Sequence, residues 1–168
     1  MKNKTTASLK SHDIYYDMLR EIETQKFLKV QIAGQVFGIN ALDVEDIIDN
    51  NDINNIPLAP DYIIGSINLR GKIVTVMDLK KKYNLSHLEE ERRRHLNAVI
   101  SINDEFYSIL VDKVYEVLDL NMDDVDFNPV TLDKKWQNIS SGIYQLEEEL
   151  LILLETQELF KKTQLEQL

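Results

Sequence analysis

The segment Ile67–Leu79, INLRGKIVTVMDL, holds an arginine and a glycine between two apolar stretches that have the composition of β-strands. Isoleucine and valine are prominent in both stretches, and β-branched side chains of this kind are enriched in strands. Residues 68–71 lie between the stretches, and asparagine and glycine are common in turns. The segment therefore predicts two strands joined at a corner that carries one charged side chain, Arg70.

The same strand character continues on both sides of this segment. Apolar and polar residues alternate from Lys26, and AGQ then turns the chain into VFGIN, which predicts a β-hairpin. Further short strands are predicted at GSINL, KIVTVM, NAVISI, EFYSILV and ELLILL. Short helices are expected after Asp78 (LKKKY), around HLEEERRRH and in TQELFKKTQLEQL. Many short strands with few helices indicate a barrel or a sandwich.

A leading helix is predicted before the first strand. Ile14, Met18 and Ile22 recur at four-residue spacing, which gives residues 11–24 one apolar face. We interpret this helix as a cap packed on its own domain, since most helices gain their stability from such packing. A partner-binding arm is the alternative.

The two halves of the chain resemble each other. VEDIID at 44–49 matches VYEVLD at 114–119, and each block follows a similar hairpin, VQIAGQVFGIN or ISINDEFYSIL. Farther along, Gly65 corresponds to Gly142, and KIVTVMDLKKKY at 72–83 corresponds to ELLILLETQELF at 149–160. We interpret this pattern as two related β subdomains.

This repeat makes the Asn68–Gly71 corner informative. Its counterpart at 145–148 reads QLEE, so Arg70 corresponds to Glu147 and Gly71 to Glu148. Because the second half builds its corner without arginine, the first half is specialised there, which is a functional hint. The structural alternative for Arg70 is an ion pair with Asp46 or Asp78.

Composition excludes several classes of function. The chain has 168 residues, 43% of them hydrophobic, no cysteine and a net charge of −10. Disulfides and thiolate metal sites are impossible, and the lack of cysteine fits a reducing cytosol. With neither a secretory h-region nor a membrane-spanning apolar run, we expect a soluble, unexported protein. Its charge repels phosphate backbones, so we expect no nucleic-acid partner.

The sequence offers no recognisable catalytic or metal-binding motif. His12, His87 and His95 share no metal-ligand spacing with a carboxylate. DDVDFNP begins like a calcium loop, but Pro129 and Lys135 stand where the turn glycine and the bidentate glutamate are needed. Phosphate-cradling loops and nucleophile motifs do not occur. We therefore expect no enzyme activity, no cofactor and no metal.

From about residue 26 to about residue 162, the order and spacing of these segments resemble the CheW-like domain family. The most specific part is the pattern P-x-x-I-x-G-x-x-N-L-R-G-x-I-x-x-x-x-D-L, carried here by Pro60, Ile63, Gly65, Asn68, Leu69, Arg70, Gly71, Ile73, Asp78 and Leu79.

The resemblance implies a mainly β fold of two related five-stranded subdomains similar to SH3-like barrels, with short helices. The expected organisation is an N-terminal extension with the amphipathic helix (1–25), the CheW-like domain (26–162, subdomain boundary near 85–100) and a tail (163–168). The second half matches the family less well, because SSGIYQLEEEL stands where a glycine-rich turn is common.

The resemblance also implies a noncatalytic adaptor, located in the cytoplasm at chemoreceptor arrays. Its expected partners are the cytoplasmic tip of methyl-accepting chemoreceptors and the regulatory domain of a CheA-type histidine kinase. The receptor-facing residues carried over from the family are Val44, Asp46, Gly65, Asn68, Leu69, Arg70 and Gly71. A pilus-motility or other chemosensory-like pathway is the alternative setting, and a small-barrel ligand-binding protein is the alternative class.

For individual site residues, structural explanations compete with contact roles. Arg70 offers a planar fork of donors that can clamp a carboxylate, but residues 68–71 could equally form a turn satisfied by their own side chains. Gly71 either admits a partner close to the backbone or supplies a positive φ. Val44 has a core position as its alternative, and Asp46 an internal pair with Arg70.

Overall fold

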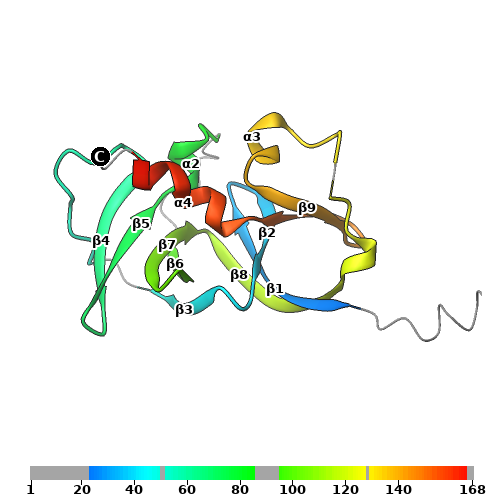
Figure 1. Cartoon of the computed structure of the whole chain (residues 1–168), viewed down its shortest axis with the longest axis horizontal. Coiled ribbons are helices and arrows are strands. Elements are labelled where there is room, and N and C mark those ends of the chain that lie inside the picture. Colours follow the sequence, from blue (N-terminus) through cyan, green and yellow to red (C-terminus); the bar gives the residue numbers. More distant parts are fainter. Residues whose placement is uncertain (1–22, 50–51, 86–94, 128, 166–168) are drawn as a thin grey trace, which may run out of the picture.

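The computed structural model describes residues 23–49, 52–85, 95–127 and 129–165, with side chains placed as far as residue 161. The described chain forms two five-stranded sheets and a few short helices (Figure 1), so the expected mainly β fold is confirmed. The strands are β1 (Thr24–Ile32), β2 (Gln35–Asn40), β3 (Val44–Ile48), β4 (Ile63–Leu69), β5 (Lys72–Met77), β6 (Leu96–Ile102), β7 (Glu105–Val111), β8 (Lys113–Asn121), β9 (Ser140–Gln145) and β10 (Leu150–Leu154). The helices are α2 (Leu79–Lys82), the 3₁₀ turn η1 (Met122–Asp124), α3 (Lys134–Gln137) and α4 (Thr156–Leu165).

Two of the expected helices are found and two cannot be compared. The helix after Asp78 is α2 and the C-terminal helix is α4. The predicted leading helix falls mainly within 1–22, and HLEEERRRH mainly within 86–94, and both of these ranges lie outside the described residues. The extension was expected to end at residue 25, but Thr24 and Gln25 already pair with β8. The first strand therefore begins earlier than predicted.

The strands are exchanged between the two halves of the sequence. Sheet A has the order β8-β1-β2-β10-β9, and sheet B has the order β3-β6-β7-β5-β4. Sheet B is a continuous stretch of chain, whereas sheet A combines the first hairpin with the last three strands. The boundary expected near 85–100 separates two sequence repeats but not two sheets. Each half lends its hairpin, β1–β2 or β6–β7, to the sheet built by the other half.

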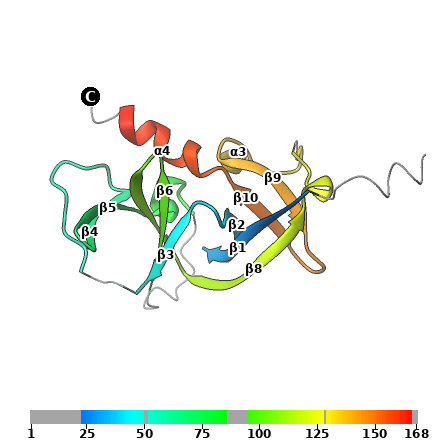
Figure 2. The same ribbon diagram turned by 60° about the horizontal axis from the view of Figure 1, so that its bottom comes forward.

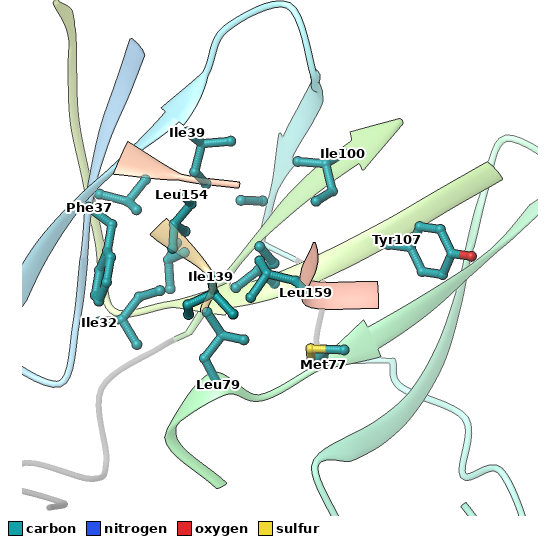
Figure 3. Close-up of a cluster of buried hydrophobic side chains, with 14 of the residues drawn as sticks. Ile32, Phe37, Ile39, Met77, Leu79, Ile100, Tyr107, Ile139, Leu154 and Leu159 are labelled. Atoms are coloured by element: carbon teal, nitrogen blue, oxygen red, sulfur yellow. The ribbon is translucent and has the colours of Figure 1, made fainter. Parts of the chain in front are cut away.

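Alternating side chains divide the apolar residues into three cores. One face of each sheet packs into a central core between the sheets, which includes Phe37, Ile39, Ile100 and Leu154 (Figure 3). The opposite face of each sheet surrounds a smaller core, formed mainly by Ile67, Val74, Val76 and Val99 in sheet B, and by Phe27, Val36, Leu120, Val125, Leu151 and Leu153 in sheet A. Strands with apolar residues on both faces follow from this arrangement.

Helix α4 closes the molecule over both sheets (Figures 1 and 2). It follows β10 of sheet A, and its Phe160 ring stacks on Tyr107 of sheet B with a centroid distance of 4.2 Å. At its start, the Thr156 hydroxyl donates to the Asp43 carboxylate at 2.8 Å, next to the passage of the chain from β2 to β3. The helix therefore fixes the two sheets to each other.

The glycines of the internal repeat explain why its two halves look alike. A side chain on Gly65 would overlap the carbonyl oxygen of Asn54, and one on Gly142 would come within 2.9 Å of the carbonyl oxygen of Asp126. In each sheet, the residue after the glycine pairs with that incoming strand segment, through the bridges Asn54–Ser66 and Asp126–Ile143. The repeat predicted from the sequence is therefore present in the backbone.

Candidate functional site

The candidate site lies at the tip of the β4–β5 hairpin, residues 68–73, which we call the hairpin tip. Leu69 pairs with Lys72, leaving a two-residue loop in which Arg70 has φ 51° and Gly71 has φ 85°. Two positive φ values match the right-handed twist of the strands. Glycine adopts this conformation without cost, but arginine does so at about 1 kcal/mol. The two-residue loop therefore imposes a strained backbone conformation on Arg70.

The other residues of the turn support its conformation. The Asn68 side-chain oxygen accepts a hydrogen bond from the Gly71 backbone N–H at 2.8 Å. Space around the Cα of Gly71 is open, so this glycine supplies the positive φ and leaves the backbone accessible. Leu69 is half-buried against the small core of sheet B. The turn is therefore held by its own groups, and the Arg70 side chain is not needed to close it.

Arg70 reaches across sheet B to Asp46. The distance from Nη2 of Arg70 to Oδ2 of Asp46 is 3.3 Å, and their side chains are 83% and 29% exposed. Because β3 and β4 are the two outer strands of sheet B, this ion pair spans the gap between its edges. Asp78, the other partner considered from the sequence, caps α2 by accepting from the Lys80 N–H. An exposed pair of this kind is worth at most about 1 kcal/mol, so a partner can displace it.

Two further side chains lie close to Arg70 in the hairpin, and the sequence did not predict either of them as a site residue. Lys72 places its Nζ 3.8 Å from the centre of the Phe106 ring on β7, above the small core of sheet B. Ile73 is 75% exposed although it lies within a strand. The sequence signals for Ile73 were its place in the family pattern and in an alternating strand, and neither could reveal which face of the strand remained uncovered.

Five of the seven predicted site residues come together at this tip: Asp46, Asn68, Leu69, Arg70 and Gly71. Val44 is half-buried and packs against the central core. Gly65 is buried beside Asn54, at the other end of β4. For Val44, the core position considered from the sequence fits its place in the structure. Gly65 is required by its close contact with the Asn54 backbone, which the sequence did not indicate.

The corresponding corner of sheet A is acidic and has a longer turn. The β9–β10 loop has four residues, closed by a hydrogen bond from the Leu146 N–H to the Glu149 carbonyl at 2.9 Å. Glu147 and Glu148 are exposed there, and Glu149 pairs with Lys29, whose pKa is raised by that hydrogen bond. A four-residue loop does not need positive φ at two successive positions. The absence of an arginine and a glycine from this corner thus has a geometric reason.

Across the residues described, no group of three or more histidine, aspartate or glutamate side chains is arranged to hold a metal ion. Within the same part of the chain, no helix is long and apolar enough to cross a bilayer.

Two five-stranded sheets, one with an exposed and charged hairpin tip, define the class of this protein as a mainly β module. The CheW-like domain family model matches residues 26–164, and the chain belongs to that family. This confirms the resemblance identified in the sequence.

Named relatives and a solved structure agree with this assignment. The chain is 25% identical to "Chemotaxis protein CheW" of Treponema pallidum (strain Nichols), covering 87% of this chain and 88% of that protein. It is 26% identical to "Chemotaxis protein CheW" of Helicobacter pylori (strain ATCC 700392 / 26695), covering 83% and 84%. The scaffolding protein TtCheW of Thermoanaerobacter tengcongensis has a similar structure, with a TM-score of 0.69, 26% identity, and coverage of 80% of this chain and 86% of that one.

Proposed function

We propose that this protein is a noncatalytic adaptor that couples the cytoplasmic tip of methyl-accepting chemoreceptors to the regulatory domain of a CheA-type histidine kinase. Family membership and the names of its chemotaxis relatives support this role. The observation that carries the proposal is Arg70, a strained and 83% exposed arginine on a turn that closes without its side chain. Strain retained at an exposed side chain is a mark of a functional site.

The chemistry of the tip fits an acidic partner. A guanidinium presents its donors in a planar fork that matches a carboxylate in two parallel hydrogen bonds. The contact with Asp46 is a single one, from Nη2, so the other donors of Arg70 can reach a partner. Leu69 and Phe106 add apolar surface beside the fork. In this proposal, a receptor carboxylate takes the place of Asp46 or joins it.

The proposed kinase contact uses a different part of the molecule. In the family, the adaptor docks through the ends of its barrels onto a kinase domain of the same fold, and we extend that mode to this chain. The adaptor would then act in the cytoplasm, held at the array by its two partners. Because the two surfaces differ, a substitution at the hairpin tip should separate receptor binding from kinase binding.

Calorimetric titration tests this proposal. The full chain is titrated with a soluble receptor-tip fragment and, separately, with the kinase regulatory domain, both from the same genome. Arg70→Glu is expected to weaken receptor binding by more than tenfold, the equivalent of 1.4 kcal/mol, and to leave kinase binding unchanged. The matched control is Lys134→Glu, the same charge reversal at an exposed residue of α3. Failure of both partners to bind the wild-type chain would overturn the proposal, as would full receptor binding by Arg70→Glu.

A further inference from the structure

The hairpin tip has two faces of different chemistry. Lys72 lies on the same face as the buried Val74, above Phe106, and Arg70 reaches over that face to Asp46. Ile73 lies between Lys72 and Val74, so its side chain points to the opposite face. One face of the tip is therefore cationic, and the other is aliphatic.

On its face of β5, Ile73 is exposed, whereas the residues farther from the hairpin tip are covered. Farther along β5, Met77 is fully buried in the central core on that face, and Thr75 is half-buried. On the neighbouring strand β7, Tyr107 is covered by Phe160 of α4. Ile73 lies beyond this cover, with Asn68 as its cross-strand neighbour. A β-branched apolar residue is thus presented to solvent directly beside the Arg70 turn.

Charge indicates what kind of partner meets the cationic face. The chain carries a net charge of −10, yet Arg70 and Lys72 stand two residues apart on one hairpin. Asp46 is the single carboxylate that contacts Arg70 in the described residues. Arg70 and Lys72 place two cations on one face of the tip in an otherwise acidic protein, and such a pair is complementary to a partner surface that carries carboxylates.

We propose that the hairpin tip binds its receptor through both faces, with Lys72 and Ile73 as contact residues besides Arg70. This inference rests on the proposed function and specifies the surface of the partner. In this binding mode, carboxylates of the receptor tip meet the cationic face, and an apolar side chain of the receptor meets Ile73.

Two substitutions test the two faces separately. Lys72→Met removes one of the two positive charges of the cationic face. Ile73→Thr removes apolar area from the other face while keeping a β-branched residue in the strand. The matched controls are Lys134→Met on α3 and Val117→Thr on β8, a 51% exposed strand residue of sheet A. Each variant is titrated with the receptor-tip fragment at low and at high salt and, separately, with the kinase regulatory domain. Its urea midpoint is measured as a check on folding.

The expected results differ between the faces. Ile73→Thr weakens receptor binding by about fivefold to tenfold at both salt concentrations, because it removes apolar burial. Lys72→Met weakens receptor binding by a similar factor at low salt and by a smaller factor at high salt, because salt screens the attraction between Lys72 and the receptor carboxylates. Both controls bind as the wild-type chain does.

Two outcomes would overturn this inference and leave the proposed function intact. If Arg70→Glu loses receptor binding but Lys72→Met and Ile73→Thr retain it, the tip makes contact through Arg70 alone. If Ile73→Thr weakens binding to the kinase domain and not to the receptor, the aliphatic face belongs to the kinase surface. Full receptor binding by Arg70→Glu would instead refute the proposed function itself.

Discussion

Replacing Arg70 with asparagine should make the protein slightly more stable while removing the side chain proposed to bind the receptor. Arg70 has φ 51°, and it is followed by Gly71 with φ 85°. Asparagine-glycine is the sequence most favoured for a two-residue hairpin loop with positive φ at both positions. Arg70→Asn therefore gives the turn the residue that its backbone conformation prefers.

The magnitude follows from two opposing terms. Relief of the left-handed conformation contributes about 1 kcal/mol. Loss of the ion pair to Asp46 costs about 0.5 kcal/mol, because the Arg70 side chain is 83% exposed and the N–O distance is 3.3 Å. The net gain of about 0.5 kcal/mol should raise the melting temperature by about 1–2 °C for a chain of this length.

The assay is urea unfolding of wild type, Arg70→Asn and Asp46→Asn, followed by circular dichroism. Asp46→Asn keeps an oxygen for its hydrogen bond to the Ile47 N–H and loses only the charge, so it isolates the ion-pair term. It should be less stable than wild type by about 0.5 kcal/mol. If Arg70→Asn loses more than about 1 kcal/mol of unfolding free energy, Arg70 supports the fold and the strain argument is wrong.

Three other predictions concern the scaffold. Burial raises the pKa of Tyr83 from 10.0 to about 12. Between pH 10 and pH 12 the Tyr83 hydroxyl is therefore ionised in the unfolded chain but still protonated in the folded chain, so the free energy of unfolding falls as the pH rises. Tyr83→Phe should therefore move the alkaline unfolding midpoint, followed by circular dichroism, to higher pH; an unchanged midpoint would refute this. Gly65→Ala should lower the free energy of unfolding in urea by about 3 kcal/mol or more, because its Cβ would overlap Asn54. Gly71→Ala, where the surrounding space is open, should lower it by about 1 kcal/mol. Equal losses for the two variants would contradict the packing argument. The Asp112 carboxylate accepts from the Ala33 N–H at 2.7 Å and pairs with Lys80, so Asp112→Asn should lose about 1–2 kcal/mol of unfolding free energy. Asp119→Asn, in an ion pair with both side chains more than 60% exposed, should lose almost none, and similar losses would count against the Asp112 prediction.

The strands that the sequence did not predict are outer strands. β3, β8 and β9 were seen as repeat blocks or loops, and each has only one full strand neighbour in its sheet. Edge strands carry charged side chains that discourage pairing with other chains. Glu45 and Asp46 on β3, and Glu116 and Asp119 on β8, interrupt the apolar alternation for this reason. Local hydrophobic periodicity is consequently weakest where a strand is half-exposed.

The sequence predicted the turn residues of the candidate site but not the side chains that lie beside the turn. A charged residue on an Asn-x-x-Gly turn is visible in one stretch of sequence, which is why Arg70 was identified. Its partner remained open between Asp46 and Asp78, because the choice depends on which strands form the edges of sheet B. Lys72, Ile73 and Phe106 were missed, since their roles depend on what covers each face of the hairpin.

By itself, the sequence determined features that depend on near neighbours: the hairpins, the helices α2 and α4 and the internal repeat. The helix α3 and the 3₁₀ turn η1 were not predicted. Only the tertiary structure decided how hairpins are exchanged between the sheets, since β2 with β10 and β5 with β7 are parallel pairs between distant segments. The uncovered face of Ile73 and the reach of Arg70 to Asp46 follow from that exchange. Backbone hydrogen bonds between strands are the same for any sequence, so the choice of partner strand rests on the packing of whole apolar faces, which no short segment specifies.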